Sequence, residues 1–329
     1  MVRRFYCLLS ILVLSNGSFA QFFKQGNALA HTFSIVARDS LTGEMAVAVQ
    51  SHWFSVGTTV SWAEAGVGAI ATQSFVNKSF GIRGLNLLRN GLSAQQALDS
   101  LLSDDEGREV RQVAIVDING NIAAHTGKNC IQYASHITGK QFSVQSNMML
   151  GNSVCRAMAS AYENAHNKPL AERLLAALDA GQAVGGDIRG RQSAAILVVP
   201  AKSEGKPWDE RPVDLRVEDS DYPLVELRRL YVLQQAYLHM NNGDLATEKN
   251  DMVKAMNEYR AAMQLVPHNI EMQYWTAITL ANNHEIDKAI PMLKKIFAGN
   301  KNWKELTRRL PAVKLLTVND VEYRKIMAL

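Results

Sequence analysis

Cysteine is scarce in this sequence, with three residues in 329. Cys7 lies in an apolar leader, so only Cys130 and Cys155 belong to the rest of the chain. No cluster of Cys and His has the spacing of a zinc site, so we expect no metal site and no cofactor. An oxidising compartment would permit Cys130 and Cys155 to pair, but two buried free thiols are at least as well supported.

Blocks of like charge are also missing. The formal net charge is +4, and Arg3 and Arg4 of the leader carry two of these positive charges. Nucleic-acid binding needs a basic patch or stripe, and none stands out. We therefore expect no nucleic-acid partner.

Long hydrophobic runs are absent after the first twenty residues. There, Arg3 and Arg4 precede an apolar run at 5–14 that is too short to span a bilayer comfortably, and small residues follow at 18–20. This pattern predicts a signal peptide over 1–20, with a second cleavage site at 28–30 that extends it to residue 30 at the latest. We expect an exported protein, periplasmic or extracellular, with no membrane partner.

What the sequence does contain is a strong hairpin pattern near its start. Two apolar, β-rich runs, 31–39 and 44–50, flank a turn of Asp, Ser, Thr and Gly. The unbroken apolar stretch 46–49 predicts a strand that is covered on both faces. Thr32 on the first strand could serve as a nucleophile near the chain start, or it could be a strand threonine without chemistry.

The following segments alternate between strand pairs and helix pairs, which predicts stacked layers of sheet and helix. Asn119-Gly120 is a strong turn signal inside a second hairpin. Ser93 is placed to cap a helix. Further strands are predicted at 58–62, 67–72, 142–145, 193–199 and 213–217, and helices at 81–90, 153–164 and 169–180.

From Pro223 the pattern is helical only, and residues 226–310 hold an internal repeat. Ala255, Tyr259 and Ala262 recur as Ala289, Leu293 and Ile296, thirty-four residues later. This period and these small and large residues fit tetratricopeptide-like helix pairs. A generic helical hairpin is the alternative.

Several motifs in chain order carry a resemblance to a known family: 32–39, 51–57, 62–69, 107–113, 125–127 and 185–193. Over residues 32–229 the chain resembles the domain-of-unknown-function family 1028. That resemblance implies an α+β fold, the four-layer αββα sandwich of N-terminal-nucleophile hydrolases. We predict this domain over 31–225 and an all-α tetratricopeptide-like region over 226–329.

The resemblance also implies a catalytic role for Thr32. In hydrolases of this fold a Thr, Ser or Cys at the mature N-terminus attacks an amide carbonyl, and its own α-amino group acts as the base. Cleavage after Ala20 leaves eleven residues ahead of Thr32, and cleavage after Ala30 leaves one. A further trimming or self-cleavage step is therefore required.

Four residues are candidates to support this nucleophile. Ser51 and His52 follow the second strand, from which polar groups could reach Thr32, although His52 could equally be structural. Asn77 and Asn147 could donate hydrogen bonds to an oxyanion, or each could cap a turn.

The charged loop 185–192 is the candidate substrate-binding segment. Arg189 and Arg191 could hold a substrate carboxylate, with Asp187 between glycines beside them. An internal Asp–Arg salt bridge is the alternative for this loop.

Two functions follow from these observations. The first is an exported amidohydrolase that acts on a small amide or peptide, including a fragment of the cell wall. The second is a non-catalytic binding or scaffold protein that holds a protein partner through its helical repeats. The sequence leaves the oligomeric state open.

Overall fold

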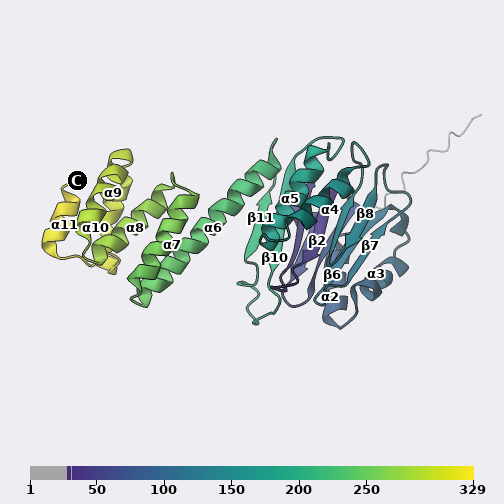
Figure 1. Ribbon diagram of the computed structural model, residues 1–329, viewed down its shortest axis with the longest axis horizontal. Coiled ribbons are helices and arrows are strands. Elements are labelled where there is room, and N and C mark those ends of the chain that lie inside the picture. Colours follow the sequence, from purple (N-terminus) through teal and green to yellow (C-terminus); the bar gives the residue numbers. More distant parts are fainter. Residues whose placement is uncertain (1–27, 31) are drawn as a thin grey trace, which may run out of the picture.

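The computed structural model describes residues 28–30 and 32–329 (Figure 1). It contains a mixed domain of helices and antiparallel sheets, followed by a helical C-terminal region, which confirms the predicted α+β class and the all-helical end of the chain. The predicted signal peptide lies outside the described residues.

The first sheet is built around the predicted hairpin, which is confirmed. Thr32 pairs with Ser51 and Arg38 with Met45, and Asp39 Oδ1 accepts the N–H groups at the turn. Its central strand β3 is fully buried, as the unbroken apolar run predicted. In the order β11-β10-β3-β2-β9-β8 the strands are β11 (Val213–Val217), β10 (Ser193–Val199), β3 (Met45–Ser51), β2 (Thr32–Arg38), β9 (Phe142–Ser146) and β8 (Ser135–Gly139).

The second sheet has the order β1-β5-β6-β7, with β4 also paired to β5. Its predicted Asn-Gly turn is confirmed, because Gly120 has a φ of +83° and Asp117 Oδ1 accepts the N–H groups of Asn119 and Asn121. The strands are β1 (Ala28–Ala30), β4 (Ser61–Glu64), β5 (Gly68–Val76), β6 (Arg111–Asp117) and β7 (Ile122–Thr126).

The strand predicted at 58–62 is wrong in its first half. Residues Gly57–Val60 form a short helix, α1, and strand β4 begins only at Ser61. The reason is tertiary packing, because a Cβ added to Gly57 would lie 2.5 Å from the Cβ of Ala195 on β10. The chain therefore packs directly on the first sheet where α1 begins, and strand propensity does not report such a contact.

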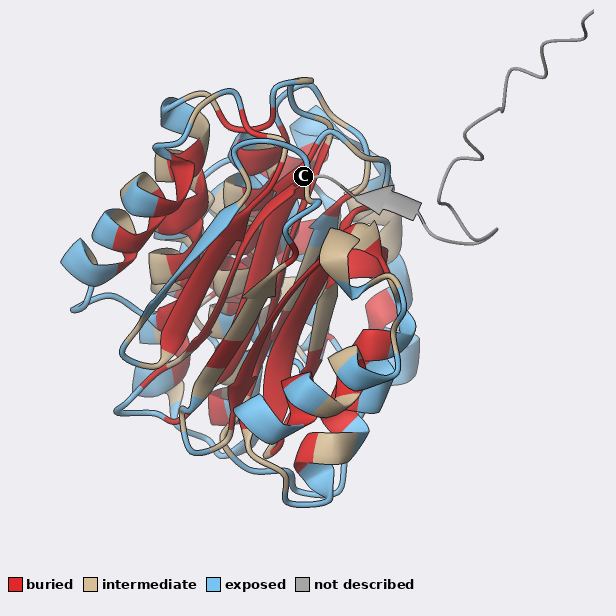
Figure 2. Ribbon diagram, turned by 90° about the vertical axis from the view of Figure 1, so that its right-hand side faces the viewer, coloured by how far each residue is buried: buried red, intermediate tan, exposed pale blue. Residues whose placement is uncertain are grey.

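The faces of the two sheets bury different sets of residues. In β2, Val36 joins an aliphatic cluster with residues of both sheets, whereas Phe33, Ile35 and Ala37 face helices α4 (Val154–Asn164) and α5 (Leu170–Ala183). This is the alternation of a strand that is covered on both sides. Helices α2 (Ser79–Arg89) and α3 (Ala94–Ser103) cover the second sheet in the same way, and Figure 2 shows the buried strands between the outer helices.

Helix α6 (Pro223–Glu248) joins this domain to the helical region (Figure 1). Leu227 and Tyr231 in its first half pack in the core around α4 and α5, whereas Ala236 and Met240 pack against the next helices. Those helices are α7 (Met252–Leu265), α8 (Ile270–Asn282), α9 (Ile286–Gly299), α10 (Asn302–Arg309) and α11 (Asp320–Met327). Within the described residues, no helix combines the length and the apolar character needed to cross a membrane.

The six positions of the internal repeat are all buried. Ala255, Tyr259 and Ala262 lie on α7, and their counterparts Ala289, Leu293 and Ile296 lie on α9. The small alanines sit where helices approach closely, so these positions have no room for a longer side chain.

We therefore expect Ala289→Leu to lower the free energy of unfolding by about 1–3 kcal/mol, because added methyl groups overpack a filled helix contact. Ala298→Leu is the control, since Ala298 is exposed on the same helix. Chemical denaturation of both variants measures the difference. Equal stability of the two variants would contradict close packing at Ala289.

Candidate active site

Thr32 opens strand β2 and is held by groups from distant parts of the chain. Its carbonyl oxygen accepts hydrogen bonds from Gln73 Nε2 at 3.2 Å and from the backbone N–H of Asn147 at 3.1 Å. Gln73 belongs to β5 of the other sheet, so the contact joins the two sheets at this end. All three residues are fully buried.

Gln112 on β6 is the centre of this amide network. Its Oε1 accepts from Gln73 Nε2 at 2.7 Å and from Asn147 Nδ2 at 2.9 Å. Its own Nε2 lies within hydrogen-bonding distance of Thr126 Oγ1 and of the Ser146 carbonyl, at 2.8 and 3.0 Å. Buried amides with satisfied partners fix one arrangement of the surrounding strands.

The network extends along β2 to Ser34. The Ser34 hydroxyl donates to Gln73 Oε1 at 2.6 Å, and Gln145 Nε2 donates to the Ser34 oxygen at the same distance. Polar side chains thus replace aliphatic ones at this end of the space between the sheets. The interior is polar around Thr32 and apolar around Val36.

Ser51 lies directly opposite Thr32 in the hairpin. Thr32 Oγ1 donates to Ser51 Oγ at 3.3 Å, and both side chains are fully buried. The structure therefore brings together Thr32, Ser51 and Asn147, three of the residues proposed from sequence.

Asn77 lies elsewhere. It follows the last residue of β5, and its Oδ1 accepts from the N–H and the hydroxyl of Ser79 at 3.1 and 2.8 Å. This is the turn-capping arrangement that the sequence left open for Asn77. Among the described residues, no contact joins its side chain to Thr32.

The side chain of His52 is exposed beside loop 185–192. Its backbone N–H donates to Asp187 Oδ2 at 3.1 Å, and a Cβ added to Gly190 would lie 3.8 Å from its ring Nδ1. Within the described part of the chain, no contact links the ring to Thr32. His52 thus belongs to the surface next to the Thr32 site.

Loop 185–192 contains an internal Asp–Arg salt bridge, which was the alternative to substrate binding by its charged residues. Arg189 donates from Nη2 to Asp187 Oδ2 at 2.7 Å and from Nε to Oδ1 at 3.0 Å, and the Asp187 side chain is buried. The Arg191 guanidinium lies 4.8 Å from the centre of the Tyr222 ring. The backbone of Asp187 also forms an isolated antiparallel β-bridge with Met149, two residues after Asn147, so the loop adjoins the Thr32 site.

The sequence reasoning missed Gln73 and Gln112, which connect this site. Each is a long polar residue inside a strand that is otherwise mostly buried and apolar. That interruption is a signal in the sequence, because a buried amide needs partners. Its partners, however, come from segments about 35 to 40 residues away, which the strand pattern does not identify.

Cys130 and Cys155 are free thiols. Burial raises the pKa of both, so neither is a ready thiolate at neutral pH. Cys155 Sγ lies 3.1 Å from Ser146 Oγ. Within residues 28–30 and 32–329, no group of three or more His, Cys, Asp and Glu residues could hold a metal ion.

A cavity of about 650 Å³ lies away from Thr32, between β4, α2, β10 and the segment before β11. Glu64 and Arg89 form an ion pair on its wall. Thr32 is not among its lining residues, and its three arginines, Arg89, Arg211 and Arg216, pair with Glu64 or Asp214. Its size suits a small molecule. The one hydroxyl–carboxylate pair that we find in its lining is Ser203 Oγ on Glu210 Oε1 at 2.7 Å, and the same oxygen accepts the N–H groups of Glu204 and Lys206, so this carboxylate caps an exposed turn.

Residues 32–227 match the family of unknown function DUF1028. The crystal structure of protein SPO2555 from Silicibacter pomeroyi, which carries the same family name, is similar with 33% sequence identity and a TM-score of 0.55, over 61% of this chain and 85% of that one. Anbu (ancestral beta-subunit) from Yersinia bercovieri has 12% identity and a TM-score of 0.29, over 61% of this chain and 93% of its own, which is too low to support an inference. None of the curated proteins matches. The family resemblance stated from the motifs is confirmed.

Gln112→Leu tests the amide network. The leucine cannot hydrogen-bond, so Gln73 and Asn147 lose their common acceptor. We expect the free energy of unfolding to fall by about 1–3 kcal/mol. The measurement is denaturant unfolding of the full chain. The control is Gln95→Leu on the exposed face of α3, which should change stability by no more than about 0.5 kcal/mol. A neutral Gln112→Leu would show that the network does not hold the sheets together.

Proposed function

This chain belongs to the family of unknown function DUF1028, and we propose that it is an exported amide hydrolase with Thr32 as its N-terminal nucleophile. One observation carries the proposal: Thr32 opens a central strand with its hydroxyl on Ser51 and its carbonyl in a buried amide network. Export rests on the apolar leader with its two arginines.

The path of the chain around Thr32 supports processing at this point. Strand β1 pairs with β5 in the second sheet, whereas β2 pairs with β3 and β9 in the first. The backbone therefore passes from one sheet to the other between Ala30 and Thr32. Cleavage of the peptide bond before Thr32 would leave a free amine at the junction of the sheets, next to the Thr32 hydroxyl.

That amine has suitable chemistry for a base, since an α-amino group has a pKa of about 7.7–8.0, close to neutral pH. It would take the proton of Thr32 Oγ1 as this oxygen attacks the amide carbonyl. The departing amine of the substrate would receive that proton, and water would then hydrolyse the ester on Thr32. In the structure the Thr32 hydroxyl donates this proton to Ser51 Oγ at 3.3 Å, so the proton would turn from Ser51 to the amine before the attack.

Asn147 is the candidate donor to the oxyanion. Its Nδ2 contacts the Thr32 carbonyl at 3.4 Å, a long hydrogen bond that a developing negative charge could compete for. Its other bond, to Gln112 Oε1, keeps the amide in place during such a change. Loop 185–192 adjoins the site through the Met149–Asp187 bridge, which supports a contact of this loop with the rest of the substrate.

The wider fold is part of this proposal. The two facing sheets with helices on both outer sides support the four-layer αββα arrangement of N-terminal-nucleophile hydrolases. The buried six-position repeat on α7 and α9 supports tetratricopeptide-like pairing in the helical region. We place the division between these parts near residue 225, inside helix α6.

The deciding experiment is the mass of the exported protein, followed by substitution of Thr32. We expect the mature chain to begin at Thr32. With that start, Thr32→Ala should lower turnover of amide and peptide substrates, wall fragments included, by about a thousandfold or more, because the attacking oxygen is gone. Thr32→Ser should keep partial activity, and Thr58→Ala, at the exposed position of α1, is the control.

A stable exported protein that begins at Gln21 would contradict this mechanism, because its amine would lie eleven residues from the hydroxyl. Full activity of Thr32→Ala would contradict it as well. Either result would favour the second function.

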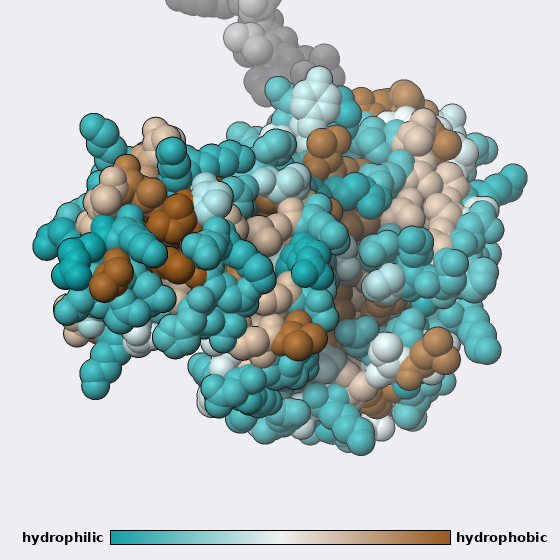
Figure 3. Space-filling model, turned by 60° about the vertical axis from the view of Figure 1, so that its left-hand side comes forward, coloured by the Kyte–Doolittle hydropathy of each residue, from teal (hydrophilic) through white to brown (hydrophobic). Residues whose placement is uncertain are grey.

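The second candidate function is the binding of a protein partner by the helical region. A groove of about 400 Å³ between α6 and α8 combines the aromatic Tyr237 and Trp275 with the acidic Asp244 and Glu271. Tyr237 Oη donates to Glu271 at 2.7 Å. Hydrophobic residues are exposed among hydrophilic ones on the helical region (Figure 3). This lining suits a peptide segment with apolar and basic side chains.

For this groove we expect Glu271→Lys to weaken binding of a basic, apolar peptide by about tenfold, because the substitution reverses the charge that faces the ligand. Glu248→Lys, exposed at the end of α6, is the matched control. Titration followed by tryptophan fluorescence measures the affinity. Equal affinities of the two variants would exclude the groove as the binding surface.

A further inference from the structure

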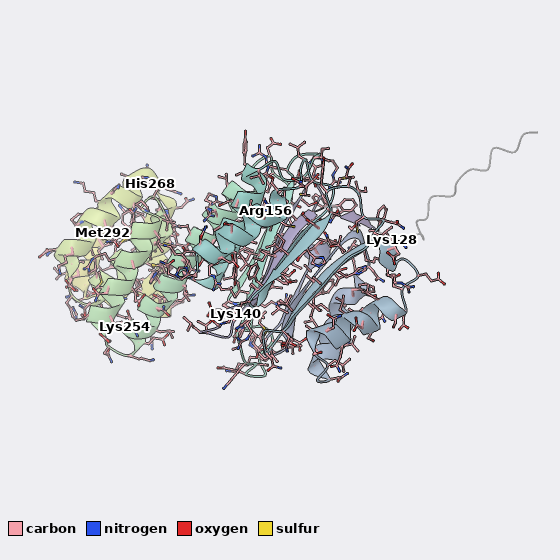
Figure 4. The ribbon with its side chains drawn as sticks, turned by 45° about the vertical axis from the view of Figure 1, so that its right-hand side comes forward. Lys128, Lys140, Arg156, Lys254, His268 and Met292 are labelled. Atoms are coloured by element: carbon pink, nitrogen blue, oxygen red, sulfur yellow. The ribbon has the colours of Figure 1, made fainter. Side chains whose placement is uncertain are left out.

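A second small cavity lies at the end of β2 opposite to Thr32. It has a volume of about 200 Å³ and is lined by groups from the β2 turn, the β8–β9 turn and helices α4 and α5. Arg38, the last residue of β2, is six residues from Thr32, which is roughly 20 Å along an extended strand. Lys140 on its wall lies at the lower end of the domain, far from Lys128 at the other end (Figure 4).

Three residues that line this cavity each carry a buried hydrogen-bond donor that has no partner among the described residues. These donors are Nε of Arg38, Nε of Arg173 and the hydroxyl of Tyr162. The Tyr162 side chain is 1% exposed. Each such group normally has an acceptor, because a buried polar group without one is costly. All three belong to residues that line the same cavity, and each of the three unpartnered atoms carries a hydrogen that it can donate.

The surroundings keep these groups as donors. Burial raises the pKa of Tyr162 to about 12, while Arg173 lowers it and Asp39 raises it further, so the hydroxyl keeps its proton at neutral pH. The Arg173 guanidinium lies 4.2 Å from the centre of the Tyr162 ring, which fixes both side chains. An arginine stays protonated throughout.

The balance of charge around the cavity is positive. Arg38, Lys140 and Arg173 line it against one carboxylate, the exposed Glu163. Asp39 pairs with Arg173 at 3.0 Å, whereas Arg38 donates to the neutral side chain of Gln141 at 2.7 Å. A ligand with several acceptor oxygens and a negative charge would satisfy the three donors and this excess of positive charge.

From this geometry we infer that the cavity at Arg38, Tyr162 and Arg173 binds an oxyanion, the phosphate or carboxylate group of a small molecule. Its volume is below the range of about 300–1,000 Å³ that holds whole drug-sized ligands, so it takes the charged group and leaves the rest of the molecule outside. The site is separate from Thr32 and does not depend on catalysis there. Both lie on β2, so an occupant would fix the far end of the strand that carries Thr32.

The test is a titration of the full chain with inorganic phosphate, and separately with citrate, in chloride buffer. Calorimetry gives the affinity and thermal unfolding gives the melting temperature. We expect saturable binding of one of the two anions, and the tighter one identifies the group as phosphate or carboxylate. Arg38→Gln should weaken that binding by about tenfold or more, because a hydrogen bond to a charged group is lost. Lys128→Gln removes the same charge from an exposed position at the other end and should bind like the wild type.

Tyr162→Phe separates a ligand site from a structural role. It removes only the unpartnered hydroxyl, so the melting temperature without anion should stay equal or rise, while the anion affinity falls by about tenfold. A lower melting temperature without anion would overturn the inference, because the hydroxyl would then hold the fold together. Equal binding by all variants, or no saturable binding of either anion, would overturn it too.

Discussion

The hydrogen bonds between Gln73, Gln112 and Asn147 are the constraint on which the rest of the structure depends. They connect strands of both sheets and close on the carbonyl of Thr32. Two sheets packed by aliphatic residues alone could slide along each other at modest cost, because dispersion contacts have little direction. Amide hydrogen bonds do have direction, and an unpaired buried amide is expensive. The network therefore sets the register of the sheets at the end where Thr32 lies.

Strand β2 transmits that constraint through the domain. Its alternate side chains face the second sheet on one side and helices α4 and α5 on the other. Ser34 continues the amide network, Val36 joins the aliphatic cluster, and Arg38 reaches the cavity at the opposite end. One seven-residue strand thus passes from a polar interior through an apolar one to a cationic rim. The pairing of β2 with its neighbouring strands fixes the position of all three regions together, because a register shift of one residue would move every side chain of β2 to the other face of the sheet.

The sequence predicted what local chemistry decides. The hairpin before Met45, the Asn-Gly turn at Gly120 and the Ser93 helix cap are confirmed, because their signals lie within a few residues. The strand at 58–62 was wrong in part, at a place where Gly57 packs against Ala195 from far along the chain. The candidate site divides in the same way. Ser51 was predicted because the hairpin places it near Thr32. The sequence did not predict Gln73 and Gln112, or the hydrogen bonds of Asn147, because these depend on contacts between distant segments that no local pattern encodes.

The same network bears on the proposed cleavage ahead of Thr32. The carbonyl of Thr32 is bound from two sides, and its side chain is bound by Ser51. None of these contacts uses the peptide bond that precedes Thr32. Removal of that bond would therefore change the charge and freedom of one amine without releasing the residue that carries it. Under the proposed mechanism, a Thr32 whose position is fixed by groups other than its own amine would lose little order when the amine becomes free, so most of the arrangement needed for attack would exist in advance.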